Sequence, residues 1–301
     1  MTESELAGTG AASAPQCILD LKATLGEGPV WMAAENALYF TDIMGRKVHR
    51  FQLGTCKLTT WEAPAPVGFL LPVSSGGFLA GLPDGLHRFD PATGAFAHMC
   101  TVEPEQPDNR LNDGCVDEQG RIWFGTMDTA ETSPSGAIYR VVARQNELEV
   151  SHWDEGYVVS NGPALSPDGK TLYVCNSPHQ RIYAFDVDGA GKLSGKRVFA
   201  TFEKGYPDGL VTDSEGTLWC GTWGGGQITR LRPDGSFLPP IALPVSNVTK
   251  VAFGGGDLRT VFVTTARKGL SEEQLAQEPL AGGLFSFQSE VAGLPQQFFQ
   301  L

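Results

Sequence analysis

A short phrase in which a residue with a side-chain oxygen stands next to glycine recurs along this chain. These phrases hold the main candidates for chemistry. The copies are Glu27-Gly28-Pro29, Asn112-Asp113-Gly114, Asn161-Gly162-Pro163 and Asp208-Gly209-Leu210. One such phrase is typical of a turn. Several in register indicate a repeat protein that brings Glu, Asn and Asp oxygens to one centre. A cluster of that kind is what a hard divalent cation requires.

The predicted site combines two carboxylates with amide oxygens. Glu27 and Asp208 supply a net charge of about −2, which suits a divalent cation and leaves coordination positions for water and substrate. Ca²⁺, Mg²⁺, Mn²⁺, Zn²⁺ and Fe²⁺ all accept such ligands, so the sequence does not choose among them. Asn247 occupies the equivalent place in the last repeat and is expected to join the wall of the site.

Two residues of this set have a plainer alternative. Asp208 lies in Pro207-Asp208-Gly209, which is also the signature of a type I turn, but it directly precedes an apolar strand. Arg110, two residues before Asn112, either holds a carbonyl or carboxylate oxygen through its planar guanidinium or forms a surface salt bridge.

Three familiar catalytic systems are absent from the sequence. It has no Gly-x-Ser-x-Gly motif for a serine nucleophile. Its five histidines are scattered with no i, i+4 pair, so a histidine-rich zinc centre is not predicted. The runs at 224–226 and 254–256 are glycines that do not open helices, so they do not predict a phosphate site.

The elements that position the oxygens are six repeats of a strand-turn-strand phrase. Equivalent points in these repeats are separated by 40, 44, 50, 46 and 43 residues: Leu38, Phe78, Ile122, Leu172, Leu218 and Val261. This spacing predicts an all-β, six-bladed β-propeller with four strands in each blade. A β-sandwich with long loops is the alternative. Residues 271–277 are the one predicted helix, opened by a capping box of Ser271 and Gln274.

The two ends of the chain are expected to differ in role. Residues 1–15 are small and polar, lack the basic and apolar regions of a signal peptide, and are predicted to form a disordered tail. Residues 16–301 are predicted to form a single propeller domain. Propellers close by pairing strands from the two termini, and residues 17–21 and 297–301 are the candidates for that closure.

Composition excludes several classes of partner. A net charge of −12 and a pI near 4.9 argue against nucleic acid binding, which requires a basic surface. No stretch approaches the roughly 18–20 apolar residues of a membrane span. The six cysteines form no Cys-x-x-Cys pair, so reduced thiols are expected. These features predict a cytoplasmic protein, and a closed ring of blades predicts a monomer.

The same motifs resemble those of the SMP-30/gluconolactonase/regucalcin-like sugar lactonases, a family of six-bladed propellers with a central divalent metal. The matching pieces are Leu25-Gly-Glu-Gly-Pro-Val-Trp31, Arg110-Leu-Asn-Asp-Gly-Cys-Val-Asp117, Gly125-Thr-Met127, Ser160-Asn-Gly-Pro163, Ser166-Pro-Asp-Gly-Lys170 and Tyr206-Pro-Asp-Gly-Leu210. The closing section, from Asn247-Val-Thr-Lys250 to Thr264-Thr-Ala-Arg-Lys-Gly-Leu-Ser271, looks especially like bacterial lactonases of the xylonolactonase type.

The resemblance implies a role for each site residue. Glu27, Asn161 and Asp208 are implied to be the metal ligands, and Asp208 also the proton-transfer residue. Arg110 and Asn112 are implied to contact the substrate. Some family members carry a further substrate-contacting glutamate after Gly-Thr-Met, and here Glu131 is displaced from that place by about one position.

The implied activity is hydrolysis of an aldonolactone to the aldonic acid, with a xylono-, glucono-, arabino- or galactonolactone as substrate. A metal-dependent esterase like the paraoxonases is less consistent, because the chain lacks a histidine dyad. A non-catalytic, calcium-binding regulatory propeller is the alternative from a different functional class, and a lactone-opening assay with and without chelator separates the two.

Overall fold

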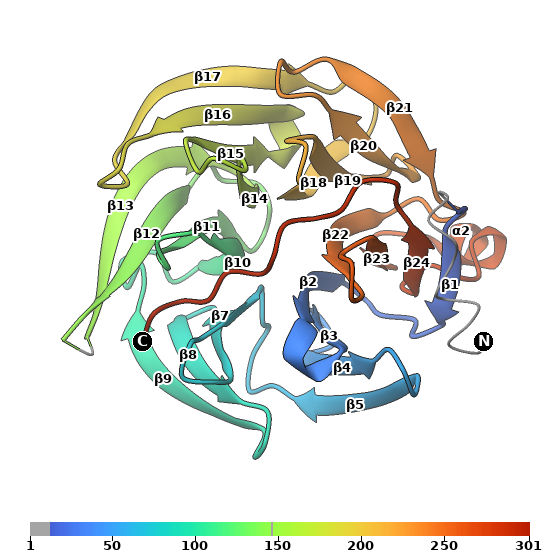
Figure 1. Cartoon of the computed structure of the whole chain (residues 1–301), viewed down its shortest axis with the longest axis horizontal. Helices are drawn as coiled ribbons and strands as arrows, with labels where there is room; N and C mark the ends of the chain where they lie inside the picture. The colour runs from blue at the N-terminus through green and yellow to red at the C-terminus, as the bar shows by residue number, and fades with distance from the viewer. Residues whose placement is uncertain (1–12, 146) are drawn as a thin grey trace.

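Six four-stranded antiparallel sheets surround a central axis in the computed structural model, which describes residues 13–145 and 147–301 (Figure 1). The predicted six-bladed β-propeller is confirmed and the β-sandwich is excluded. Each predicted strand-turn-strand phrase forms the second and third strands of one blade. The sheets follow one another in chain order, with the first strand of each blade lying next to the axis.

The first three blades span residues 26–157. Their strands are β2 (Gly26–Met32), β3 (Ala37–Asp42), β4 (Lys47–Gln52) and β5 (Lys57–Glu62); β6 (Leu70–Pro72), β7 (Phe78–Leu82), β8 (Gly85–Asp90) and β9 (Ala95–Thr101); and β10 (Asn109–Val116), β11 (Ile122–Asp128), β12 (Gly136–Arg144) and β13 (Glu147–Tyr157).

The other three blades span residues 160–288 and take one strand from the N-terminus. Their strands are β14 (Ser160–Leu165), β15 (Thr171–Asn176), β16 (Arg181–Val187) and β17 (Leu193–Thr201); β18 (Tyr206–Thr212), β19 (Leu218–Trp223), β20 (Gln227–Leu231) and β21 (Phe237–Ala242); and β22 (Val248–Gly254), β23 (Thr260–Thr265) and β24 (Leu284–Gln288) with β1 (Gln16–Leu19).

The same hydrogen-bonded aspartate motif stabilises the turn after the innermost strand in two of the blades. Asp117 accepts hydrogen bonds from the backbone N–H of Gln119 and Arg121 and from the indole N–H of Trp123 at 2.9 Å. Asp213 does the same for Glu215, Thr217 and Trp219. Each aspartate carboxylate accepts hydrogen bonds from both the turn backbone and the buried indole. Each segment from Asp to Trp therefore stabilises the hairpin between the first and second strands of its blade.

The ring closes through β1, which pairs with β24 and supplies the outermost strand of the last blade. The expectation for residues 17–21 is therefore confirmed in part, but the expectation for residues 297–301 is wrong. β24 already occupies the place beside β1, and residues 291–301, here called the C-terminal strap, instead cross the face of the ring (Figure 1). Phe299 of the strap is fully buried and bridges to Val73 next to β6.

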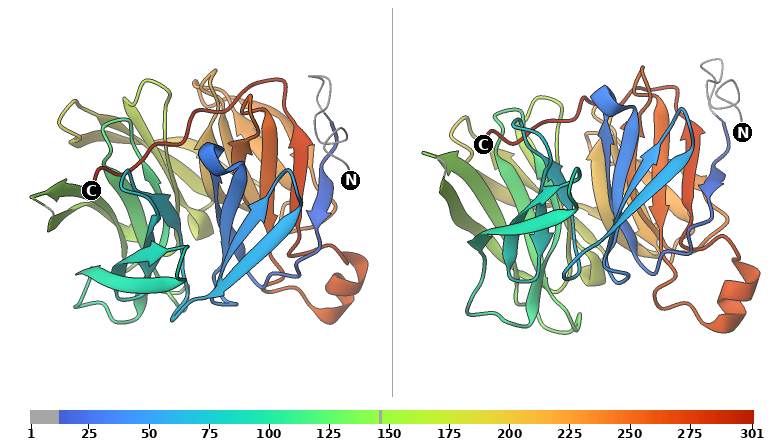
Figure 2. Two further views of the ribbon diagram at one scale, coloured as in Figure 1. Left: turned by 60° about the horizontal axis from the view of Figure 1, so that its bottom comes forward. Right: turned by 90° about the horizontal axis from the view of Figure 1, so that it is seen from below.

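The two faces of the ring carry different additions. The C-terminal strap lies on one face and α2 (Glu272–Gln277) on the opposite one (Figure 2). The predicted capping box of α2 is present, with Ser271 and Gln274 bonded reciprocally. Most of the predicted tail, residues 1–12, lies outside the described residues, while the Ser13 N–H donates to the Gln288 carbonyl at 3.2 Å.

Two expectations about the chain as a whole can be compared with the structure. All six cysteines are free thiols, as expected from their spacing. Among the described residues, no helix is both long and apolar enough to cross a membrane.

Candidate metal and active site

The innermost strands change register at the predicted site residues. The pairing of β2 with β3 slips between Glu27 and Val30, and that of β14 with β15 slips between Asn161 and Ala164. Equivalent slips occur between Leu111 and Asp113 in β10 and between Pro207 and Leu210 in β18. A β-bulge of this kind bends the strand and re-aims its side chains. The site residues thus lie inside the innermost strands, where the glycine-containing phrases form bulges and not simple turns.

Five of the predicted site residues line one cavity of about 290 Å³, here called the mouth cavity, and Lys268, which lies just before α2, lines it as well. The five come from four blades, and each side chain belongs to a residue that is at most 7% exposed. The structure therefore brings together the predicted metal ligands and substrate-binding residues: Glu27, Arg110, Asn112, Asn161 and Asp208.

A chain of hydrogen bonds orients the two asparagines. Arg110 Nη1 donates to Asn112 Oδ1 at 2.6 Å, and Asn112 Nδ2 donates to Asn161 Oδ1 at 2.8 Å. Asn161 Nδ2 donates to Ser177 Oγ at 2.9 Å, which fixes the orientation of the Asn161 amide. Asn112 Nδ2 also donates to the Ser160 carbonyl, so its two N–H groups are both used. Asn161 Oδ1 keeps a lone pair that a cation can accept.

The two carboxylates are buried without a cationic partner in contact. Glu27 Oε2 accepts a hydrogen bond from the Gly28 N–H at 2.8 Å, and no hydrogen bond reaches the Asp208 carboxylate from residues 13–145 or 147–301. Burial, followed by the charge of Asp113, raises the pKa of Glu27 to about 8. Burial, followed by the charge of Glu27, raises the pKa of Asp208. Both groups can be ionised together only with a positive charge beside them, and the oxygen donors fit a hard divalent cation.

Arg110 adds a buried positive charge beside these carboxylates. Burial lowers the pKa of its guanidinium to about 10, so it stays protonated at neutral pH. One of its amino groups is bonded to Asn112 and to the Leu111 carbonyl. The remaining N–H groups have no partner in the described part of the chain, and the surface salt bridge considered as an alternative is not formed there. The free N–H groups of the Arg110 guanidinium are thus available to an oxygen-bearing ligand in the mouth cavity.

The rim of the mouth cavity holds residues that the sequence reasoning did not single out. Lys268 lines the cavity and forms an ion pair with Glu131, the displaced glutamate of the resemblance. Tyr206 and Trp223 also line it, and Tyr206 is 45% exposed. Asn247 does not join the wall as expected, because its amide accepts from the Gly224 N–H and donates to the Lys268 carbonyl.

An ion pair that the sequence reasoning missed crosses the channel below the mouth cavity. Lys250 Nζ on β22 donates to both carboxylate oxygens of Asp113 on β10, at 2.6 and 2.7 Å. Burial opposes charge on Lys250, but its pKa is still raised, owing to Asp113. Since β22 and β10 belong to the sixth and third blades, the pair joins opposite sides of the ring. A lone lysine within Val248-Thr-Lys-Val-Ala-Phe253 was the available signal.

Lys250 also explains one glycine of the recurring phrase. A Cβ atom added at Gly209, the residue after Asp208, would lie 2.4 Å from Lys250 Cγ and 2.5 Å from its Cβ. The aliphatic part of Lys250 therefore passes directly over the backbone of β18. Glycine is required there for close approach, whereas Gly28 and Gly162 adopt positive φ angles of 54° and 73°.

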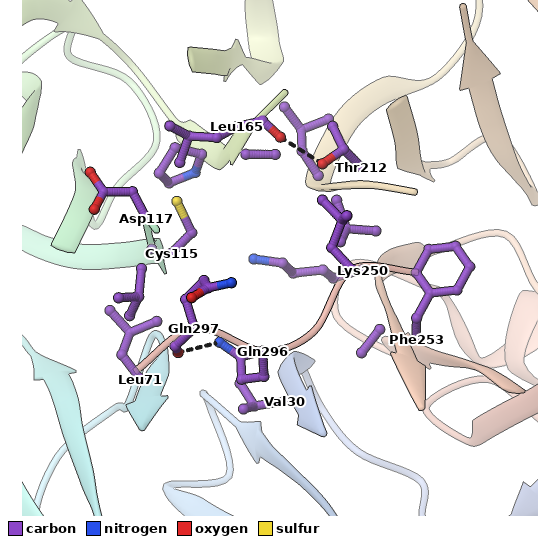
Figure 3. A pocket seen from close by; sticks show the side chains of 18 of the residues that line it. Val30, Leu71, Cys115, Asp117, Leu165, Thr212, Lys250, Phe253, Gln296 and Gln297 are labelled. Atoms are coloured by element: carbon purple, nitrogen blue, oxygen red, sulfur yellow. Dashed lines mark hydrogen bonds between the residues drawn. The ribbon is translucent and has the colours of Figure 1, made fainter. Parts of the chain in front are cut away.

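The ion pair lines a second cavity of about 200 Å³, here called the strapped cavity. Figure 3 shows Lys250 reaching from β22 into its centre, with Gln296 and Gln297 of the C-terminal strap beside it. Its walls are largely apolar and include Val30, Leu71 and Phe253. The channel therefore has two chemically different ends.

Comparisons with known proteins agree with this arrangement. Residues 25–267 match the model of the SMP-30/gluconolactonase/LRE-like region. The chain is 34% identical to a 6-deoxy-6-sulfogluconolactonase of Pseudomonas putida, over 94% of this chain and 98% of that protein. It is 36% identical to an L-arabinolactonase of Azospirillum brasilense, over 92% of each.

A solved structure has the same fold. The calcium-binding protein regucalcin from Agrobacterium tumefaciens superposes with a TM-score of 0.91 at 29% identity, covering 96% of this chain and 98% of that one. The chain belongs to the SMP-30/gluconolactonase/LRE-like family, whose named relatives above include lactonases, hydrolases of cyclic esters.

Proposed function

We propose that this chain hydrolyses a sugar aldonolactone to the open aldonic acid, with one divalent cation held by Glu27, Asn161 and Asp208. The observation that carries the proposal is the convergence of two buried carboxylates, with no cation in contact, and an oriented amide oxygen on one cavity. The names of the two lactonase relatives support the substrate class. Xylono-, glucono-, arabino- and galactonolactone are the candidate substrates, and we expect a cytoplasmic monomer.

The cation, when bound, supplies Lewis-acid polarisation of the lactone carbonyl and stabilises negative charge on its oxygen. The residues of the chain have separate tasks. The free N–H groups of Arg110 hold a carbonyl or hydroxyl oxygen of the sugar, and Asn112 Oδ1 keeps a lone pair for a sugar hydroxyl. Trp223 and Tyr206 give the rim apolar surface for the carbon face of the ring.

Asp208 carries the proton in this proposal. Its carboxylate takes a proton from water as the water oxygen bonds to the carbonyl carbon. The bond from that carbon to the ring oxygen then breaks, and the same carboxyl returns the proton to the departing oxygen. Glu27 holds the second negative charge in place and does not transfer a proton. No nucleophilic side chain is required, since lactones already open slowly in water.

The alternative is a calcium-binding propeller without catalysis, favoured by the description of the regucalcin structure as a calcium-binding protein. A pH-indicator assay on the four candidate lactones separates the two functions. The protein is stripped with chelator and tested with Ca²⁺, Mn²⁺, Zn²⁺, Mg²⁺ or Fe²⁺ added back. We expect opening above the spontaneous rate that chelation removes. Saturable cation binding with no lactone opened above that rate would instead establish the alternative.

A further inference from the structure

A second group of metal-binding side chains lies outside the channel, on the second blade. A carboxylate oxygen of Asp84 and one ring nitrogen each of His87 and His98 all lie within 4.8 Å of one another. None of the three lines the mouth cavity or the strapped cavity. We propose that they form a second metal site, which takes a borderline transition-metal ion such as Zn²⁺, Co²⁺, Ni²⁺ or Cu²⁺.

The backbone holds the carboxylate close to the neighbouring strand. Asp84 lies in the turn between β7 and β8, and its carbonyl accepts a hydrogen bond from the Val102 N–H just beyond β9. Gly85 follows with φ 138°, and a Cβ atom there would lie 2.0 Å from the Cys100 carbonyl oxygen. The turn is therefore pressed against β9, so the position of Asp84 relative to that strand is fixed.

Strand register places the two histidines opposite each other. His87 of β8 pairs with His98 of β9, and their rings meet edge to face with centroids 5.1 Å apart. Directly paired residues on antiparallel strands keep their Cβ atoms about 5 Å apart. The His87 ring is nearly buried, at 9% exposure for the residue, and its Nε2 lies 2.8 Å from Asp84 Oδ1. The group is thus built by the sheet and not by mobile side chains alone.

The donor set selects the kind of ion. Zn²⁺ binds imidazole nitrogen at about 2.0–2.1 Å and carboxylate oxygen at about 2.0–2.2 Å, so its ligand atoms lie roughly 3.4 Å apart. Asp84 and His98 are both exposed, so their side chains are free to rotate toward that spacing around the nearly buried His87. The ion would take the place of the hydrogen bond between Asp84 Oδ1 and His87 Nε2. Ca²⁺ and Mg²⁺ prefer sets made only of oxygen, so they favour the channel residues instead.

The five histidines of the chain provide a direct test by NMR of their imidazole groups. The full-length protein is stripped with chelator, saturated with CaCl₂ and then titrated with ZnCl₂. We expect the His87 and His98 signals to shift saturably at one equivalent while those of His49, His152 and His179 stay in place. Calcium alone should move none of the five. A titration in which the His87 and His98 signals stay in place would overturn the proposal.

A variant and its matched control give a second measurement. His98→Gln removes one ligand at an exposed position, whereas His179→Gln changes an exposed histidine outside the group. By calorimetry, we expect His98→Gln to lose one Zn²⁺ equivalent and His179→Gln to lose none, with lactone opening unchanged in both. An equal Zn²⁺ stoichiometry in His98→Gln and the unaltered protein would refute the site. This outcome is independent of the channel, so it leaves the proposed lactonase function untouched.

Discussion

The two ends of the channel are built by the same innermost strands but differ in how their buried carboxylates are neutralised. At the mouth cavity, Glu27 and Asp208 are buried with no cation in contact. At the strapped cavity, Asp113 is equally buried but lies 2.6 Å from the ammonium of Lys250. The first arrangement leaves room for a cation from solution, whereas the second contains its own. A buried carboxylate thus indicates a binding site when the fold has not already neutralised it.

Neighbouring residues serve the two ends because the bulges redirect them. Asn112 lines the mouth cavity while Asp113, the next residue, lines the strapped one. Asp208 faces the mouth while Gly209 makes room for Lys250. One strand therefore carries a proposed binding residue next to a structural one. Substitutions at the two ends should separate these roles.

The largest expected effect is on activity, from the mouth cavity. Asp208→Ala and Glu27→Ala should each lower lactone opening by about 10³-fold, because the proposed function assigns proton transfer to Asp208 and cation binding to both. Gln297→Ala, in the strapped cavity, is the control and should keep full activity. Circular dichroism checks that the variants fold. Full activity in Asp208→Ala would contradict the roles given to the mouth cavity.

The next effect is on stability, from the ion pair between the cavities. Lys250→Met leaves Asp113 buried and unpaired, which should reduce the free energy of unfolding by about 3–5 kcal/mol. Adding Asp113→Asn removes the unpaired buried charge and should restore most of the lost free energy of unfolding. Urea unfolding of the two single variants and the double variant measures the coupling. Additive losses would mean that Lys250 and Asp113 do not act as a pair.

The C-terminal strap should matter for stability and not for catalysis. Phe299→Ala empties a fully buried position and should cost about 3–5 kcal/mol. Phe298→Ala, at a neighbouring residue that is 38% exposed, should change stability by about 0.5 kcal/mol or less. Both should open lactone at the normal rate under conditions where they are folded. A loss of activity in folded Phe299→Ala would show that the two ends are coupled.

A smaller effect tests the close approach of Lys250 to β18. Gly209→Ala places a methyl group against the lysine side chain and should cost about 1–3 kcal/mol through overpacking. Gly256→Ala is the matched control, because nothing lies within 4 Å of its added methyl group. Thermal unfolding compares the two. Equal melting temperatures would show that β18 and Lys250 separate without cost.

The pH dependence of the metal-free protein provides a further test of the mouth cavity. Because the pKa of Glu27 is raised to about 8, the folded protein retains a proton that the unfolded chain releases near pH 4.5. Stability should therefore fall as pH rises from about 4.5 to 8, by up to about 1.4 kcal/mol per pH unit. Urea unfolding in chelator should show a weaker fall for Glu27→Gln than for the exposed control Glu62→Gln. Identical slopes would contradict a buried, protonated Glu27.

Much of the fold was predictable because each blade repeats a local pattern. The spacing from Leu38 to Val261 gave six blades, and Ser271 with Gln274 gave the helix cap. The strap was not predictable, since the segment with Phe298 and Phe299 is equally consistent with a closing strand. Only the pairing of β24 with β1, which takes the position that a closing strand would need, decides between the two.

The residues of the candidate site were predictable, but the ion pair and the bulges that hold them in place were not. Glu27, Asn161 and Asp208 share a motif, whereas Lys250 and Asp113 meet only because their blades face each other across the axis. No spacing along the chain encodes that contact. The bulges that aim the side chains are likewise set by pairing between strands, so their register cannot be read from β2 or β18 alone.

The most direct measurement of the central claim is anomalous scattering from crystals of the protein grown with Mn²⁺. We predict one strong peak in the mouth cavity, within coordination distance of Glu27, Asn161 and Asp208, and its loss in crystals of Asp208→Ala. If ordered crystals of the unaltered protein show no peak between these three residues at saturating Mn²⁺, the account of the channel as a cation-dependent site is wrong.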